Sequence, residues 1–239
     1  MKKIVLAAMM MIVGLTTGYS QEQEIDPSKP TNLYSGAGIE LGAVGKDKVA
    51  RLSAMFSWNP KNLLLSELPF KVSPEGKMQA GNLRLRYFNV PYLDYSKTFG
   101  AFGLSVDAFI PVGNADGGRI TVAPGAVLGL IASEKFSMFP IASYLYTSKS
   151  RFQKIEGDHE MHGAQFELMM VYSSGNFYAR TSPKYKLYDF KSGTESCSVD
   201  LMFGWTVGKH WIGAYAKKEF GKGKICPQNE LSLIYTFYF

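Results

Sequence analysis

The residues with the most reactive side chains are three histidines, His159, His162 and His210, and two carboxylates beside the first two. In the segment GDHEMH, Asp158 and Glu160 alternate with these histidines. A metal site needs ligands that converge at a fixed geometry, and an H-x-x-H spacing in a polar connecting segment does not supply it. The pattern favours a solvated loop, so neither a metal nor another cofactor is predicted.

Hydrolytic chemistry would need a serine with a histidine beside it to act as base. No histidine lies inside an alternating apolar segment, and His210 belongs to the turn-like tripeptide GKH. No serine is marked as a nucleophile by its neighbours. Enzyme activity is therefore the third hypothesis, behind two that the charged residues suggest.

Charged residues recur along the chain at a spacing of two. Arg84 and Arg86 alternate with apolar residues in NLRLRY, and Lys184 and Lys186 alternate in PKYKLY. A period of two predicts strands with one polar and one apolar face. Ten charged residues are the candidates for a polar face: Glu40, Arg51, Glu67, Arg84, Arg86, Asp107, Glu167, Arg180, Lys184 and Asp200.

The elements that position these residues are strands along most of the chain. Twelve are predicted, at 33–44, 49–58, 62–72, 78–92, 99–112, 119–132, 136–148, 163–173, 176–188, 195–207, 210–220 and 228–239. These lengths suit the ~9–11 residues with which a tilted strand crosses a membrane. The sequence predicts an all-β fold, a transmembrane antiparallel up-and-down β-barrel of twelve strands, with ten as the alternative.

The connections between the strands give an independent check on this fold. If the chain ends in the periplasm, short turns at 59–62, 94–98, 133–135, 173–176 and 208–210 lie there. The connections at 45–48, 73–77, 113–118, 150–162, 189–194 and 221–228 then lie outside, and they include the longest, as in outer-membrane barrels. Pro69 disfavours a central strand at 62–72, but omitting that strand would separate the two chain ends. Pro124, Pro140 and Pro183 suggest local bulges.

The first residues of the chain predict export. Residues 1–20 combine two lysines, a short apolar run and small residues at 18 and 20, as a cleaved signal peptide does. The apolar run is too short for the roughly 20 residues of a membrane-spanning helix. Residues 21–32 would form a periplasmic tail and residues 33–239 the barrel. Removing two lysines lowers the formal charge from +6 to +4, which is too mild to predict nucleic-acid binding.

Charge and position together predict where the ten candidate residues point. A charge that faces lipid costs about 2–4 kcal/mol near the bilayer centre, so these residues must face the lumen. Arg84 and Arg86 are expected beside Asp107, and Lys184 and Lys186 beside Asp200. Such residues either form an ion-pair network that props and blocks the barrel, or line a path for a small solute.

Aromatic residues near the strand ends predict interfacial girdles. They are Trp58, Trp205, Trp211, Tyr144, Tyr146, Tyr235 and Phe239. Two cysteines, Cys197 and Cys226, are expected at the outer end, on strands about 10 Å apart. A disulfide needs Cα atoms within about 7 Å, which loop curvature could provide, so a disulfide and two free thiols both stay open.

The central part of the chain also resembles a known family. The runs LLLSELPFKVSPEGKMQAGNLRLRYFNVP and FGLSVDAFIPVGNADGG, followed by TVAPGAVLGLIASEKFSMFPIASYLYTS, carry the resemblance. They are similar to segments of the transporter-like outer-membrane barrels labelled as phenol-degradation (meta-pathway) proteins. The resemblance covers about a third of the chain and implies a barrel that transports a small molecule.

The sequence as a whole predicts a protein of the Gram-negative outer membrane. The leading hypothesis is a narrow channel for a small solute. A plugged barrel with a structural or surface-interaction role competes with it, and a lipid-modifying enzyme is third. The expected partners are outer-membrane lipid, a small-molecule solute, and the barrel-assembly machinery through the terminal Phe239; nucleic acid is not expected.

Overall fold

The computed structural model describes residues 35–59, 61–94, 96–112, 115–150, 158–221 and 229–239. The predicted signal peptide (1–20) and tail (21–32) lie outside these residues. The strands are β1 (Gly36–Val44), β2 (Asp47–Asn59), β3 (Asn62–Val72), β4 (Met78–Ala80), β5 (Asn82–Leu93), β6 (Phe99–Pro111), β7 (Thr121–Ser133), β8 (Phe136–Thr147), β9 (Met161–Ser174), β10 (Phe177–Asp189), β11 (Thr194–Val207), β12 (His210–Gly221) and β13 (Asn229–Tyr238). A short 3-10 helix, η1 (Ala115–Gly118), follows β6.

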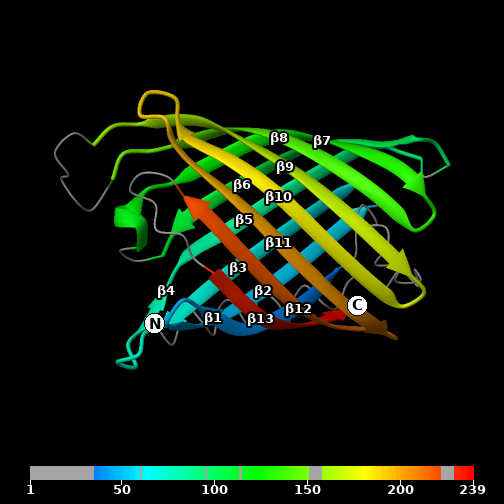
Figure 1. Cartoon of the computed structure of the whole chain (residues 1–239), viewed down its shortest axis with the longest axis horizontal. Helices are drawn as coiled ribbons and strands as arrows, with labels where there is room; N and C mark the ends of the chain where they lie inside the picture. The colour runs from blue at the N-terminus through cyan, green and yellow to red at the C-terminus, as the bar shows by residue number, and fades with distance from the viewer. Residues whose placement is uncertain (1–34, 60, 95, 113–114, 151–157, 222–228) are drawn as a thin grey trace.

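These strands form one antiparallel sheet that closes on itself (Figure 1). The closure is made by β1, which pairs with β2 on one side and with β13 on the other, from Gly36 opposite Tyr238 to Val44 opposite Glu230. The short β4 and the longer β5 both pair with β3. Together they count as one strand of the barrel wall, called a crossing below. The predicted twelve-stranded barrel is therefore confirmed, with β4 as an extra segment.

The two faces of the sheet differ as the alternation predicts. In β13, Leu231 and Leu233 are 66% and 70% exposed, whereas Ser232 and Thr236 are 4% and 5% exposed. Since the exposed positions of a closed barrel point outward, the apolar side chains form a belt that suits lipid. No helix among the described residues is long and apolar enough to cross a membrane.

The irregularity near Pro69 lies in the β4–β5 segment beside it, and β3 itself is continuous. The strand β3 runs through Pro69 without a break, while the neighbouring crossing is interrupted at Gly81. The register changes there, from Glu67 opposite Arg84 to Phe70 opposite Ala80, and the amide of Gly81 donates to the carbonyl of Pro69 at 2.8 Å. One extra residue on the β4–β5 side is a β-bulge.

The bulges suggested at Pro124, Pro140 and Pro183 are absent. Each proline lacks a pairing on one side, but the register before and after it is the same. The first outer connection is also shorter than predicted. Gly45 has φ 60° and β2 starts at Asp47, which together make a two-residue hairpin.

The aromatic girdle is present on the lipid-facing surface with one exception. The rings of Phe177 and Trp205 lie 5.2 Å apart, and those of Trp58 and Tyr87 are stacked at 5.9 Å. Trp211, predicted for the girdle, is only 4% exposed and points into the barrel. Its indole lies against Gly213, where an added Cβ would come within 2.4 Å of it.

Candidate functional site

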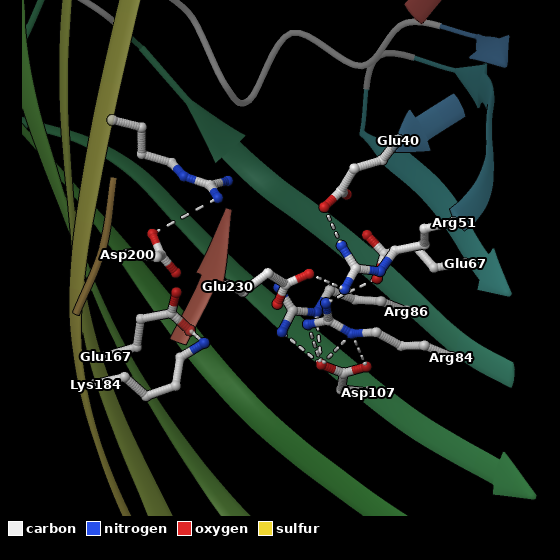
Figure 2. Close-up of polar contacts among 11 residues, drawn as sticks. Glu40, Arg51, Glu67, Arg84, Arg86, Asp107, Glu167, Lys184, Asp200 and Glu230 are labelled. Atoms are coloured by element: carbon white, nitrogen blue, oxygen red, sulfur yellow. Dashed lines mark hydrogen bonds and ion pairs between the residues drawn. The ribbon is translucent and has the colours of Figure 1, made fainter. Parts of the chain in front are cut away.

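The ten candidate residues lie on the inward face of the barrel wall, opposite the exposed apolar belt. They come from eight strands: β1 (Glu40), β2 (Arg51), β3 (Glu67), β5 (Arg84, Arg86), β6 (Asp107), β9 (Glu167), β10 (Arg180, Lys184) and β11 (Asp200). Figure 2 shows that they gather in two groups.

The first group contains two arginine-centred networks. Arg51 lies between Glu40 and Glu230, with nitrogen–oxygen distances of 2.5 and 2.7 Å. Because Glu40 is on β1 and Glu230 on β13, Arg51 on β2 ties together the three strands at the closure of the barrel. These contacts stabilise the seam where the ends of the sheet meet.

In the other network of the first group, Arg84 and Arg86 share the carboxylate of Asp107. Arg84 donates to Asp107 at 2.7 Å and to Glu67 at 3.0 Å, while Arg86 donates to Asp107 at 2.5 Å (Figure 2). The pairing of both arginines with Asp107 agrees with the expectation from sequence. The carboxylate is well buried, with 9% of its side chain exposed, so the two arginines supply most of its charge compensation.

The second group consists of two ion pairs on β9, β10 and β11. Lys184 pairs with Glu167 at 3.0 Å, and Arg180 lies 3.8 Å from Asp200. The expected pairing of Lys184 with Asp200 is therefore wrong. The register places Lys184 opposite Glu167 on one side and opposite Ser198 on the other.

The ion pairs of these two groups follow the wall of the barrel. Each joins neighbouring strands, except that between Arg51 and Glu230, which spans β1. Neighbouring strands lie only about 4.8 Å apart. The pairs therefore coat the inner surface and do not reach across the lumen.

A cation–ring contact does reach across the lumen. The ammonium of Lys186 on β10 lies 6.0 Å from the ring centre of Phe109 on β6, and three strands separate the two. The same ring carries the guanidinium of Arg84 at 5.4 Å. Sequence reasoning missed Phe109 because an aromatic residue was expected to face lipid.

An apolar cluster lies inside the barrel at the end with the short turns. Its buried side chains lie near the ends of the strands that meet the short turns: Val127, Phe139, Ile141, Val171, Tyr178 and Trp211. The rings of Tyr178 and Trp211 meet edge to face at 6.5 Å. The charged part of the lumen is therefore followed, towards the short turns, by a buried apolar cluster.

The outer half contains a cavity of about 180 Å³ beside the first ion-pair group. It is lined by Val44, Val49, Arg51, Pro69, Lys71, Lys217, Glu219 and Glu230. Lys217 and Glu219 of β12 were not among the predicted residues, although their spacing of two carries the same signal. This cavity is large enough for several water molecules.

The described residues of the GDHEMH segment, Asp158 to His162, interact with separate partners. Asp158 pairs with Arg119, His159 lies 3.3 Å from Asp189, and His162 bonds to the hydroxyl of Tyr144. The described residues contain no group of three potential metal ligands.

The predicted disulfide is not tested by the structure. Cys197 is exposed on the outward face of β11, while Cys226 lies outside the described residues. The bridge between them stays a prediction.

Comparisons with known proteins bear on the fold. No protein-family model matches the sequence, and no curated protein matches it significantly. Among solved structures, an outer-membrane channel from Pseudomonas putida F1 has a TM-score of 0.63 at 14% identity, over 90% of this chain and 100% of that one. The NanC porin has a TM-score of 0.65 at 10% identity, over 85% and 100%.

An enzyme shares the same architecture. The outer-membrane phospholipase A of Escherichia coli has a TM-score of 0.54 at 12% identity, over 95% of this chain and 96% of that one. At such identities the likeness concerns the fold alone. It confirms, together with the apolar outer belt, that this chain is an outer-membrane β-barrel.

Proposed function

We propose that this barrel is a narrow channel through which a small polar solute crosses the outer membrane. The observation that carries the proposal is the direction of the ion pairs. They join neighbouring strands along the wall, so the paired charges line the interior and do not bridge it. Residues that line a barrel lumen set its selectivity. Two solved structures with this fold are a channel and a porin, which supports the same reading.

The apolar cluster near the periplasmic end favours a second candidate function. Phe139, Val171, Tyr178 and Trp211 would block passage if they met at the centre of the lumen. A hydrophobic constriction of this kind can exclude water and hold a pore closed. The barrel would then have a structural role or present its outer loops to a partner.

Conductance separates these two candidates. The purified full chain, with folding verified by heat-modifiable migration on a gel, would be inserted into planar bilayers in KCl. Discrete current steps are expected, and Arg84→Ala should change their size. Lys218→Met is a matched control, because Lys218 faces outward on β12. A folded barrel that carries no current, and that also admits no small sugar in a liposome swelling assay, would exclude the channel.

Three further assignments are part of this proposal. The chain would be exported by a Gram-negative bacterium through the signal at residues 1–20, and it would belong to the phenol-degradation barrel family that its central segments resemble.

Phe239 would be recognised by the barrel-assembly machinery. In support of this, the amide of Phe239 bonds to the carbonyl of Ser35 at 3.0 Å, and its ring lies 6.3 Å from that of Phe237. Phe239→Ala should therefore lower the amount of assembled barrel in outer membranes.

A further inference from the structure

Two inward-facing lysines, Lys71 and Lys186, have no carboxylate partner among the described residues, and of the two Lys186 is the one that contacts aromatic rings. Arg51, Arg84, Arg86, Arg180, Lys184 and Lys217 each lie within 4.0 Å of an aspartate or glutamate oxygen. Lys186 is half-buried on the same inward face, and no ion pair involves it among the described residues. Its contacts are with two aromatic rings, those of Phe109 at 6.0 Å and Tyr188 at 5.9 Å.

The neighbouring ladder positions explain this difference. Lys184 stands opposite Glu167 of β9, and the pair is closed at 3.0 Å. Two residues further along, Lys186 stands opposite Gln165 of β9 and Ser196 of β11, both neutral. Lys184 therefore has a carboxylate opposite it on β9, whereas Lys186 has only neutral side chains opposite it.

The surroundings of Lys186 are strongly positive. Its main electrostatic interactions are with three other cations, Lys184, Lys217 and Arg84, and with one carboxylate, Asp107. That carboxylate is already bonded to Arg84 and Arg86. Because like charges repel more strongly inside a protein than in water, an anion from solution would relieve this cluster.

We propose that Lys186 is the binding residue for a small organic carboxylate that enters the lumen from outside. The ammonium would pair with the carboxylate group, and the rings of Phe109 and Tyr188 would contact a flat apolar body attached to it. Charge-assisted pairs are the stronger hydrogen bonds, and aromatic rings add dispersion contacts to a planar solute. This inference rests on the proposed channel, since a solute must reach the lumen.

Equilibrium binding tests the site without requiring conduction. The folded full chain in detergent micelles would be titrated with 4-fluorobenzoate and followed by fluorine NMR, with empty micelles as blank. Saturable binding is expected for the native protein. Lys186→Met should weaken it about tenfold or more, the typical effect of losing one charge-assisted contact.

Two further variants separate a binding residue from a merely structural one. Lys218→Met removes a lysine that makes the same kind of ring contact, 5.3 Å from Phe220, but on the outward face; its binding should equal that of the native protein. Gln165→Glu keeps Lys186 but gives it the partner that Glu167 gives Lys184. It should weaken binding as Lys186→Met does. Both variants can be verified as folded by heat-modifiable migration.

Planar bilayers then link the site to transport. With a KCl gradient, the reversal potential of the native channel should indicate preference for chloride, and Lys186→Met should reduce it. Saturable binding without any current would refute the proposed channel and leave the anion site standing. No saturable binding to the native protein, or equal binding by the native, Lys186→Met and Gln165→Glu proteins, would overturn the anion site whether or not the barrel conducts.

Discussion

Replacing Asp107 with asparagine should both loosen the barrel and leave Arg86 without its ion pair. Asp107 is shared by Arg84 and Arg86, whose side chains are 26% and 18% exposed. Removing one partner from a fully buried pair costs about 3–5 kcal/mol, and an exposed pair contributes about 0–1 kcal/mol. These side chains lie between the two limits, so we expect the free energy of unfolding to fall by about 2 kcal/mol.

The same substitution should change ion selectivity. Arg84 keeps Glu67 as a partner, but Arg86 loses its ion pair, and the lumen gains one positive charge. The reversal potential in a KCl gradient should therefore move towards that of chloride. Stability would be measured by urea unfolding in lipid vesicles, followed by tryptophan fluorescence. Glu75→Gln, on the exposed connection after β3, is the control. If Asp107→Asn matched this control in both assays, the network would neither stabilise the barrel nor line its path.

Three other substitutions probe the buried apolar cluster and the short turn after β5. Trp211→Ala should raise single-channel conductance and lower the free energy of unfolding by about 3 kcal/mol, near the lower end for a buried large-to-small change; unchanged conductance would show that the indole does not narrow the path. Gly213→Ala should lower conductance, because the added Cβ would meet the indole at 2.4 Å and push it off the wall; a rise would contradict this geometry. In the turn after β5, the hydroxyl of Ser96 bonds to Asp94 and holds the pKa of that carboxyl below its usual value. The ionised carboxyl of Asp94 therefore contributes to stability above its ordinary pKa, and this contribution is lost as the pH falls through the lowered pKa. Ser96→Ala should raise this pKa in a carbon-detected NMR titration, and an unchanged value would assign the shift to another bond.

Alternation alone was enough to predict the barrel and its outward belt. Leu231 and Leu233 face outward and Ser232 faces inward because a strand turns successive side chains to opposite faces. What alternation does not contain is the register between strands. Pro69 was predicted to disturb β3, but the bulge formed at Gly81 on the adjoining crossing, where the chain has no side chain to clash with the proline ring.

The same limit explains the wrong partner for Lys184. Sequence spacing placed Lys184 and Asp200 on neighbouring inward faces, which is correct. The pairing register then decides which charges meet, and it places Asp200 opposite Ser182, two positions away. A shift of two residues preserves every face assignment, so no pattern in one sequence can detect it.

Apolar residues on the inward face were the other class that sequence reasoning missed. Trp211 was assigned to lipid because lumen positions were assumed to be polar. A signal was available in Gly204 and Gly213, which are inward-facing neighbours on β11 and β12. Two glycines at such positions leave a flat patch of wall on which a large ring can lie, as the indole of Trp211 does.

The lumen charges can serve both a structural role and transport if the charges in ion pairs are considered separately from Lys186. Pairs such as Lys184–Glu167 lie along the wall and tie adjacent strands together, so they would exist in a plugged barrel as well. Lys186 has no ion pair among the described residues and lies beside other cations, so it does not tie adjacent strands together in this way. A carboxylate at the position of Gln165 would stabilise the fold more. Stability alone therefore explains the paired charges but not Lys186. A solute that brings its own negative charge explains why this lysine is left without a partner.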